Sequence, residues 1–262
     1  MCKSENEASI HAMEKGVVNS ASIMVPCAQF DEMAAYGRAN AEADFGVHLT
    51  LTSEWNTYKW KPVLSADRVP SLVDENGFFH ASSAAVNHHA HVQEVEKELR
   101  AQIEKYIASG LQPTHLDTHM TVAITNPEFL KIYLKLGREY RLPILLNDQL
   151  CKWFEIELRD HTTEKDFVLD GLFMANPYDH EKGLFEYYTQ VLQNMPAGVN
   201  CMLVHTGFNN DEMKEITGGD IPYGSNWRQL DLDFFTSATC EQLIRDNDIR
   251  LITWKEIKQK LF

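Results

Sequence analysis

Short apolar segments that are typical of buried strands alternate with helical segments along most of this sequence. Strands are expected at residues 20–25, 45–51, 142–146, 199–204 and 249–253. The clearest helix is expected at residues 92–108, where apolar side chains recur every three or four positions. Strands that alternate with helices predict a parallel sheet with helical crossovers.

The length of the chain and its lack of a nucleotide-binding motif refine this fold class. With 262 residues, 44% of them hydrophobic, the chain has the size of one α/β barrel domain. No glycine-rich nucleotide-binding motif is present, so a doubly wound nucleotide-binding sheet loses support. We therefore expect a single domain over residues 1–262, built as a mostly parallel (β/α) barrel of the TIM type.

The chain opens on a helix, at about residues 4–15, with Ser4 and Glu7 as the expected capping box. A barrel of this class normally opens on a strand. The expected barrel is therefore incomplete and lacks its first strand, and we expect the natural protein to begin further upstream. A gap in a parallel barrel exposes unpaired strand edges, and a homodimer across them is one hypothesis.

Residues 53–91 form an expected long loop excursion within this domain. Four aromatic side chains in it, Trp55, Trp60, Phe78 and Phe79, form either a sugar-stacking wall or ordinary loop packing. Three histidines near its end, at positions 88, 89 and 91, are more typical of an exposed helix start than of a metal site.

Charge and cysteine usage narrow the classes of partner. Acidic residues outnumber basic ones by 38 to 24, which gives a net charge of −14 and disfavours nucleic acid and anionic membranes. A neutral small molecule or oligosaccharide remains as substrate. The five cysteines are scattered without a C-x-x-C pair, and the first residues do not form a signal peptide, so a cytoplasmic protein is expected.

Histidines mark the ends of three expected strands: those at residues 45–51 and 199–204, and a further one that carries the motif at residues 115–119. His48 lies late in one strand, His119 ends the sequence His-Leu-Asp-Thr-His, and His205 follows the apolar strand at residues 199–204. In a barrel the carboxyl ends of parallel strands meet at one mouth, so these three imidazoles are expected to converge there.

The motif at residues 115–119 carries two further polar groups. Alternation places His115, Asp117 and His119 on one side of an extended segment. Such groups are costly to bury unless they are paired, and a divalent metal is their usual shared partner. His115 by itself is more typical of a structural residue than of a ligand.

Five short motifs, in order along nearly the whole chain, resemble those of the YdjC-like carbohydrate deacetylase family. They lie at residues 19–22, 46–52, 113–119, 204–208 and 228–237. The resemblance implies an incomplete (β/α) barrel, a divalent metal (magnesium or zinc) and hydrolysis of the N-acetyl group of an amino sugar or short oligosaccharide.

Residue by residue, the resemblance implies that His48 and His119 are metal ligands. His205 would be the acid that protonates the departing amine, a role that suits histidine because an unperturbed imidazole has a pKa near neutrality. Independently of the resemblance, the chemistry of the motif leads us to expect that Asp117 orients a histidine or acts as a third ligand. The pair of aspartates that the family carries at the end of its first strand is not in this sequence. We therefore expect weak metal binding and little turnover.

Two alternatives stay open. A non-catalytic descendant of the same fold would bind carbohydrate through the same cavity. A glycosidase would need two carboxylates at strand ends, and only Asp117 qualifies.

Two interpretations also remain for the neighbouring residues Trp227 and Arg228. In one, both line the pocket; in the other, Arg228 forms an ion pair with Asp231 or Asp233.

Overall fold

The computed structural model describes residues 1–262, which divide into two compact units. The first unit comprises Met1 and residues 20–168 and 253–262, and the second comprises residues 2–19 and 169–252. The expected single domain over residues 1–262 stays a prediction.

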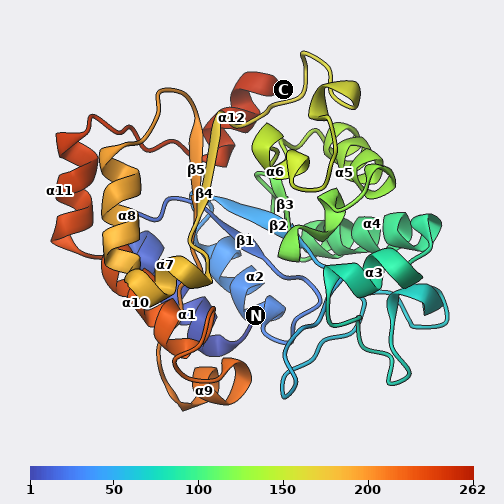
Figure 1. Cartoon of the computed structure of the whole chain (residues 1–262). Coiled ribbons are helices and arrows are strands. Elements are labelled where there is room, and N and C mark those ends of the chain that lie inside the picture. The colour runs from blue at the N-terminus through green and yellow to red at the C-terminus, as the bar shows by residue number, and fades with distance from the viewer. The chain divides into compact units, whose positions relative to one another are not determined.

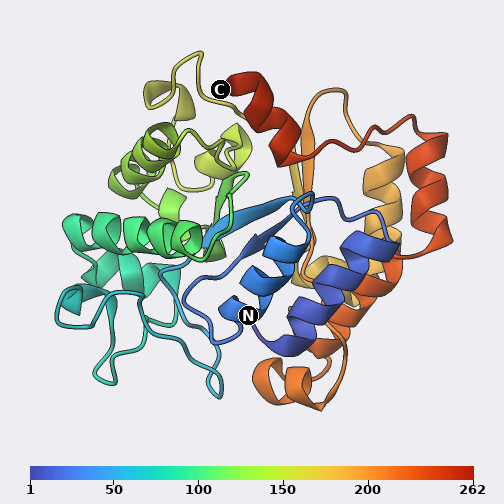
Figure 2. The ribbon, with the colours of Figure 1, turned by 180° about the vertical axis from the view of Figure 1, so that it is seen from behind.

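The first unit is built on an open parallel sheet of three strands (Figure 1). Its strands, in spatial order, are β1 (Ala21–Ile23), β2 (Phe45–Leu49) and β3 (Leu116–Thr118). α2 (Phe30–Ala39) connects β1 to β2, and the amphipathic α4 (Val92–Ala108) leads from the long excursion back to β3. Figure 2 shows α4, in green, running alongside this sheet. The register pairs His48 with Asp117, and that pairing positions the candidate site.

The excursion after β2 contains two short helices and is tied to α4 by carboxylates. The helices are η1 (Pro70–Leu72) and α3 (Ser83–His89). Glu98, fully buried on α4, accepts the backbone N–H groups of Val63 and Leu64 at 2.8 and 3.0 Å. Glu94, one turn earlier, accepts both the N–H and the hydroxyl of Ser71. The excursion is therefore anchored to the helix by buried polar contacts.

The rest of the first unit is helical, with loops between the helices. Its elements are η2 (His119–Ile124), α5 (Pro127–Tyr140), α6 (Asp148–Lys152), η3 (Leu158–Asp160) and α12 (Trp254–Leu261). α5 begins at Pro127 because Asn126 caps its first turn and proline suits the first helical position.

The second unit contains a parallel pair of strands and six helices. The strands are β4 (Gly171–Met174) and β5 (Asn200–Leu203). The helices are α1 (Lys3–Lys15), α7 (Pro177–Lys182), α8 (Leu184–Gln193), α9 (Asp211–Thr217), α10 (Ser225–Phe235) and α11 (Ala238–Asp246). Tyr188, Trp227, Phe234 and Phe235 form the centre of its core. Figure 2 shows α1, in blue, beside α10, in orange.

The expected parallel strands with helical crossovers are confirmed, whereas the TIM-like barrel is not. The five strands form two open sheets of three and two strands. The expected strand at residues 142–146 is reduced to one bridge, between Leu116 and Ile144, because Pro143 lacks the N–H that a ladder needs. The expected closing strand at residues 249–253 is irregular, and Leu251 is exposed.

The start of α1 also differs from the prediction. The helix begins at Lys3 after Cys2, and no side chain at Cys2 caps it, so the capping box from Ser4 to Glu7 is wrong. The reason is a contact from another helix. The Glu212 carboxylate of α9 accepts the N–H groups of Lys3 and Ser4, so the Ser4 N–H that Glu7 was expected to bind has another acceptor. The Ser4 hydroxyl donates to the Phe208 carbonyl at 2.9 Å. No helix of the chain is both long and apolar enough to cross a membrane.

Candidate functional site

Three neighbouring strands each contribute one polar side chain to the carboxyl end of the first sheet. His48 of β2 places Nδ1 at 2.7 Å from Asp117 Oδ1 of β3. Ser22 of β1 donates its hydroxyl to the other oxygen of Asp117, also at 2.7 Å. Burial raises the pKa of Asp117, but the adjacent His48 ring and its hydrogen bond lower it further, so the net pKa is below the usual value. Asp117 is thus an ionised acceptor.

His119 follows β3 directly and faces His48. Its Nδ1 lies 3.3 Å from His48 Nε2, and the two rings meet edge to face with centroids 5.2 Å apart. The other nitrogen of His119, Nε2, lies 2.9 Å from the Glu54 carboxylate. The Trp60 ring meets the His119 ring edge-on at 5.9 Å. The sequence did not suggest Glu54, because it lies in an aperiodic loop.

The distance between the two imidazoles fits a shared cation. Because the Asp117 carboxylate only accepts hydrogen bonds, a proton of His48 lies on Nδ1, and in the neutral ring the lone pair of Nε2 faces His119. Two imidazole nitrogens bound to one tetrahedral ion at about 2.0–2.1 Å lie about 3.3 Å apart. His48 and His119 match that spacing.

Asp117 contacts the outer nitrogen of His48, away from the nitrogen that faces His119. This is the position of a residue that orients a ligand. No group of three histidine, cysteine or carboxylate side chains is arranged to hold one ion, so the pair offers two donors.

His115 lies apart from this pair and has structural contacts. Its buried ring stacks on Trp254 with centroids 4.8 Å apart, and Nδ1 lies 3.0 Å from the Thr114 hydroxyl. Burial lowers its pKa, although nearby carboxylates act against that shift. A Cβ at Gly46 would come within 2.4 Å of the ring, so glycine leaves the room that His115 occupies. These contacts fit the interpretation of His115 as structural.

His205 belongs to the second unit, where it follows β5. Its backbone N–H donates to Asp231 Oδ2 at 2.8 Å, and the Tyr188 hydroxyl donates to Asp231 Oδ1. Burial raises the pKa of Asp231 to about 7, although these hydrogen bonds act against the shift. The His205 ring meets the Tyr223 ring edge-on at 5.7 Å. Convergence of His205 with the other two histidines stays a prediction.

The aromatic residues of the excursion mostly pack inside it. Trp60 is 3% exposed and donates its indole N–H to the Thr52 carbonyl, and Phe79 is fully buried, so neither can stack on a sugar. Trp55 and Phe78 are partly exposed. The loop-packing interpretation therefore holds for Trp60 and Phe79.

Trp227 is buried in the second unit, where it stacks between His180 and Tyr223. Arg228 forms its ion pair with Glu5, at 2.5 Å, so the predicted ion pair with Asp231 or Asp233 is wrong. Arg228 reaches Glu5 because α1 packs against α10. The two residues are 223 positions apart in the sequence, so the sequence alone did not suggest this pair.

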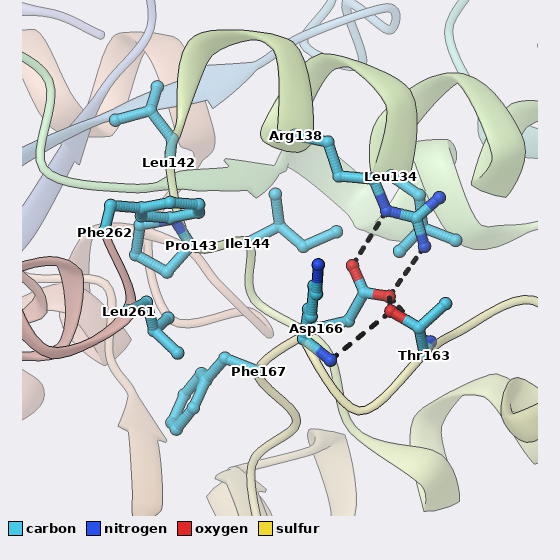
Figure 3. A pocket seen from close by; sticks show the side chains of 12 residues that line it. Leu134, Arg138, Leu142, Pro143, Ile144, Thr163, Asp166, Phe167, Leu261 and Phe262 are labelled. Atoms are coloured by element: carbon cyan, nitrogen blue, oxygen red, sulfur yellow. Dashed lines mark hydrogen bonds and ion pairs between the residues drawn. The ribbon is translucent and has the colours of Figure 1, made fainter.

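The cavities of the two units do not contain the predicted site residues. In the first unit, a cavity of about 430 Å³ lies between the end of α5 and the last residues of the chain (Figure 3). Leu142, Pro143, Ile144 and Phe262 give it an apolar lining. Arg138 points to Asp166 at its rim, and the two form a pair of hydrogen bonds. A second cavity, of about 450 Å³, lies in the second unit beside His180.

Comparisons with known proteins agree with the resemblance. The family model described as YdjC-like protein matches residues 1–246. A carbohydrate deacetylase of Enterococcus faecalis is 38% identical over 255 residues, which cover 95% of this chain and 90% of the relative. A carbohydrate deacetylase of Brevibacillus brevis is 28% identical over 265 aligned positions, with 97% and 94% covered.

Among solved structures, a putative cellobiose-phosphate cleavage protein from Enterococcus faecalis superimposes with a TM-score of 0.81 at 26% identity. The alignment covers 98% of this chain and 94% of that one. A family match over most of the chain, together with relatives that align along nearly their full length, establishes the family. This chain belongs to the YdjC-like family, whose similar members named above include carbohydrate deacetylases.

Proposed function

We propose that this chain is a carbohydrate deacetylase that removes the N-acetyl group from an amino sugar or short oligosaccharide with a divalent cation held by His48 and His119. The observation that carries the proposal is the 3.3 Å separation of His48 Nε2 and His119 Nδ1, with Asp117 fixing the His48 ring from its far side. The substrate class comes from the relatives, which are named carbohydrate deacetylases.

Hydrolysis of an acetamide needs an activated water, a stabilised oxyanion and a protonated leaving amine. A bound divalent cation supplies the first two, since it polarises a carbonyl and lowers the pKa of water. The chain contributes the orientation of the ligands: Asp117 holds the His48 ring, and Ser22 holds Asp117. Imidazole donors favour zinc over magnesium, because magnesium prefers oxygen ligands.

His205 is the proposed general acid for the departing amine. An imidazole titrates near neutrality, so it can donate a proton at physiological pH and regain it from water. The irregular segment after β5 that carries His205 is held by the hydrogen bond from the His205 backbone N–H to the buried Asp231.

Two protein donors are fewer than the three that catalytic zinc sites usually offer. We therefore expect this chain to bind zinc weakly, and its turnover to rise with the concentration of added ion. Low activity without added metal is also expected, because two imidazole donors hold the ion weakly.

The proposal is tested by measuring acetate release from N-acetylglucosamine oligomers, once in the presence of a chelator and once with added Zn²⁺ or Mg²⁺. We expect release that depends on the ion and falls at least about 100-fold in His48→Ala and His119→Ala, since each removes one of two donors. His91→Ala is the matched control, because His91 is exposed and lies outside the pair.

Equal release in chelator and in metal would contradict the proposed role of the cation. Oligomer binding without any acetate release would instead support the carbohydrate-binding alternative.

A further inference from the structure

The segment that leaves β2 brings a second carboxylate to the histidine pair. Glu54 lies at the start of the long excursion, and its Oε2 is 2.9 Å from His119 Nε2. Both side chains are largely shielded, with 20% of Glu54 and 15% of His119 exposed. The two residues are 65 positions apart, so this contact is made only by the fold.

The backbone around Glu54 is held by buried contacts. Trp60 donates its indole N–H to the Thr52 carbonyl at 2.7 Å and its backbone N–H to the Ser53 hydroxyl at 3.1 Å. The Ser53 N–H donates to the His80 carbonyl at 2.9 Å. Thr52, Ser53 and Trp60 are buried, so the residue before Glu54 has a fixed position and limits where the carboxylate can reach.

We propose that Glu54 is a positioning residue for His119, as Asp117 is for His48. This inference rests on the proposed function, in which the two histidines bind one cation. A carboxylate only accepts hydrogen bonds, so Glu54 holds the His119 proton on Nε2 and leaves the lone pair of Nδ1 facing His48. His48 and His119 therefore have opposite tautomers, with protons on Nδ1 and Nε2 respectively.

The consequence is a chain of four groups, from Asp117 through His48 and His119 to Glu54. Both outer nitrogens carry protons bound to carboxylates, and both inner nitrogens direct lone pairs at each other across 3.3 Å. Two such lone pairs repel unless a cation, or a proton in an Nδ1–H···Nε2 hydrogen bond from His119 to His48, lies between them. Carboxylates on the outer nitrogens also make imidazole ligands more basic, and losing one typically weakens metal binding 10–100-fold.

A simpler alternative is an ion pair between Glu54 and a doubly protonated His119. The two possibilities differ in one measurable property. The proposal requires one proton on the neutral His119 ring, on Nε2, whereas the ion pair requires protons on both nitrogens.

Long-range ¹H–¹⁵N spectra of the metal-free full chain, labelled at histidine, measure the tautomers directly. At mildly alkaline pH we expect His119 as the Nε2–H form and His48 as the Nδ1–H form. Glu54→Gln should keep the His119 form, because an amide oxygen still accepts, and Glu54→Ala should release it to a mixture. A proton on Nδ1 or on both nitrogens of wild-type His119, or an unchanged form in Glu54→Ala, would overturn the proposal.

Zinc titration of the same proteins gives an independent readout. We expect the apparent Kd to rise about 10–100-fold in Glu54→Ala and less in Glu54→Gln. Glu75→Ala is the matched control, since Glu75 is an exposed carboxylate of the same excursion and its removal makes the same change in net charge. An unchanged Kd in Glu54→Ala would contradict the positioning role.

The tautomer measurement and the zinc titration together distinguish a failure of the proposed role of Glu54 from a failure of the proposed function. Zinc binding at the pair that is indifferent to Glu54 would leave the proposed function standing and reject the role of Glu54. The expected tautomers without any zinc binding would support the proton placement by Glu54 and reject the proposed function.

Discussion

Replacement of the buried Asp231 is expected to change how the stability of the protein depends on pH. It is fully buried, and it accepts hydrogen bonds from the Tyr188 hydroxyl and from the His205 backbone N–H. Burial raises its pKa from 3.8 to about 7, in spite of these bonds and the positive charge of Arg228. The native protein therefore keeps a proton on Asp231 at pH values where the unfolded chain has lost it.

This difference fixes the sign of a pH effect on stability. Because the folded pKa is the higher one, the native state binds the extra proton between about pH 4 and pH 7, and the free energy of unfolding falls as the pH rises through that window. A difference of about three units corresponds to about 4 kcal/mol at 1.36 kcal/mol per unit. Asp231→Asn cannot ionise, so it should lose this contribution.

Urea unfolding of wild type and Asp231→Asn, followed by tryptophan fluorescence from pH 4 to pH 8, measures the effect. We expect the stability of the variant relative to wild type to rise by about 4 kcal/mol across this range, because all other titrations cancel in the difference. Asp233→Asn, an exposed site on the same helix, should show no such trend. A flat difference, or one that falls with pH, would refute the assignment of a raised pKa to Asp231.

Three further substitutions test packing and polar contacts in the first unit. Gly46→Ala should destabilise the chain by about 1–3 kcal/mol in urea unfolding, because the new methyl group meets the buried His115 ring; an unchanged midpoint would show that the ring can move away. Glu98→Ala should cost about 3 kcal/mol and speed amide hydrogen exchange in the excursion, since two backbone N–H groups lose their buried acceptor; unchanged exchange there would reject the anchoring role. Tyr133→Phe should cost about 1–3 kcal/mol, because the hydroxyl accepts the Leu145 N–H and donates to the Leu116 carbonyl; a neutral effect on the urea midpoint would show that water replaces it.

The spacing of apolar residues predicted the helices and strands that have a continuous apolar face of their own. The helix expected at residues 92–108 is α4, residue for residue, because its apolar face is continuous and Gly110 follows it. The strand at residues 45–51 is found as β2 (Phe45–Leu49). β4 (Gly171–Met174) was missed, since a four-residue strand between irregular segments gives little periodic signal.

Contacts between distant segments set the features that the sequence could not predict. The start of α1 depends on Glu212, a residue of α9, and the partner of Arg228 depends on α1. Asp117 could be found because it lies in a motif with period two, and His48 because it lies late in an apolar strand. Glu54 could not, because its position depends on how the long loop folds back to His80.

The shared cation site of His48 and His119 is the central claim, and anomalous diffraction from crystals soaked in millimolar Zn²⁺ tests it most directly. The account predicts a zinc peak within about 2.0–2.2 Å of both His48 Nε2 and His119 Nδ1. Zinc at other histidines with none between these two nitrogens would contradict it.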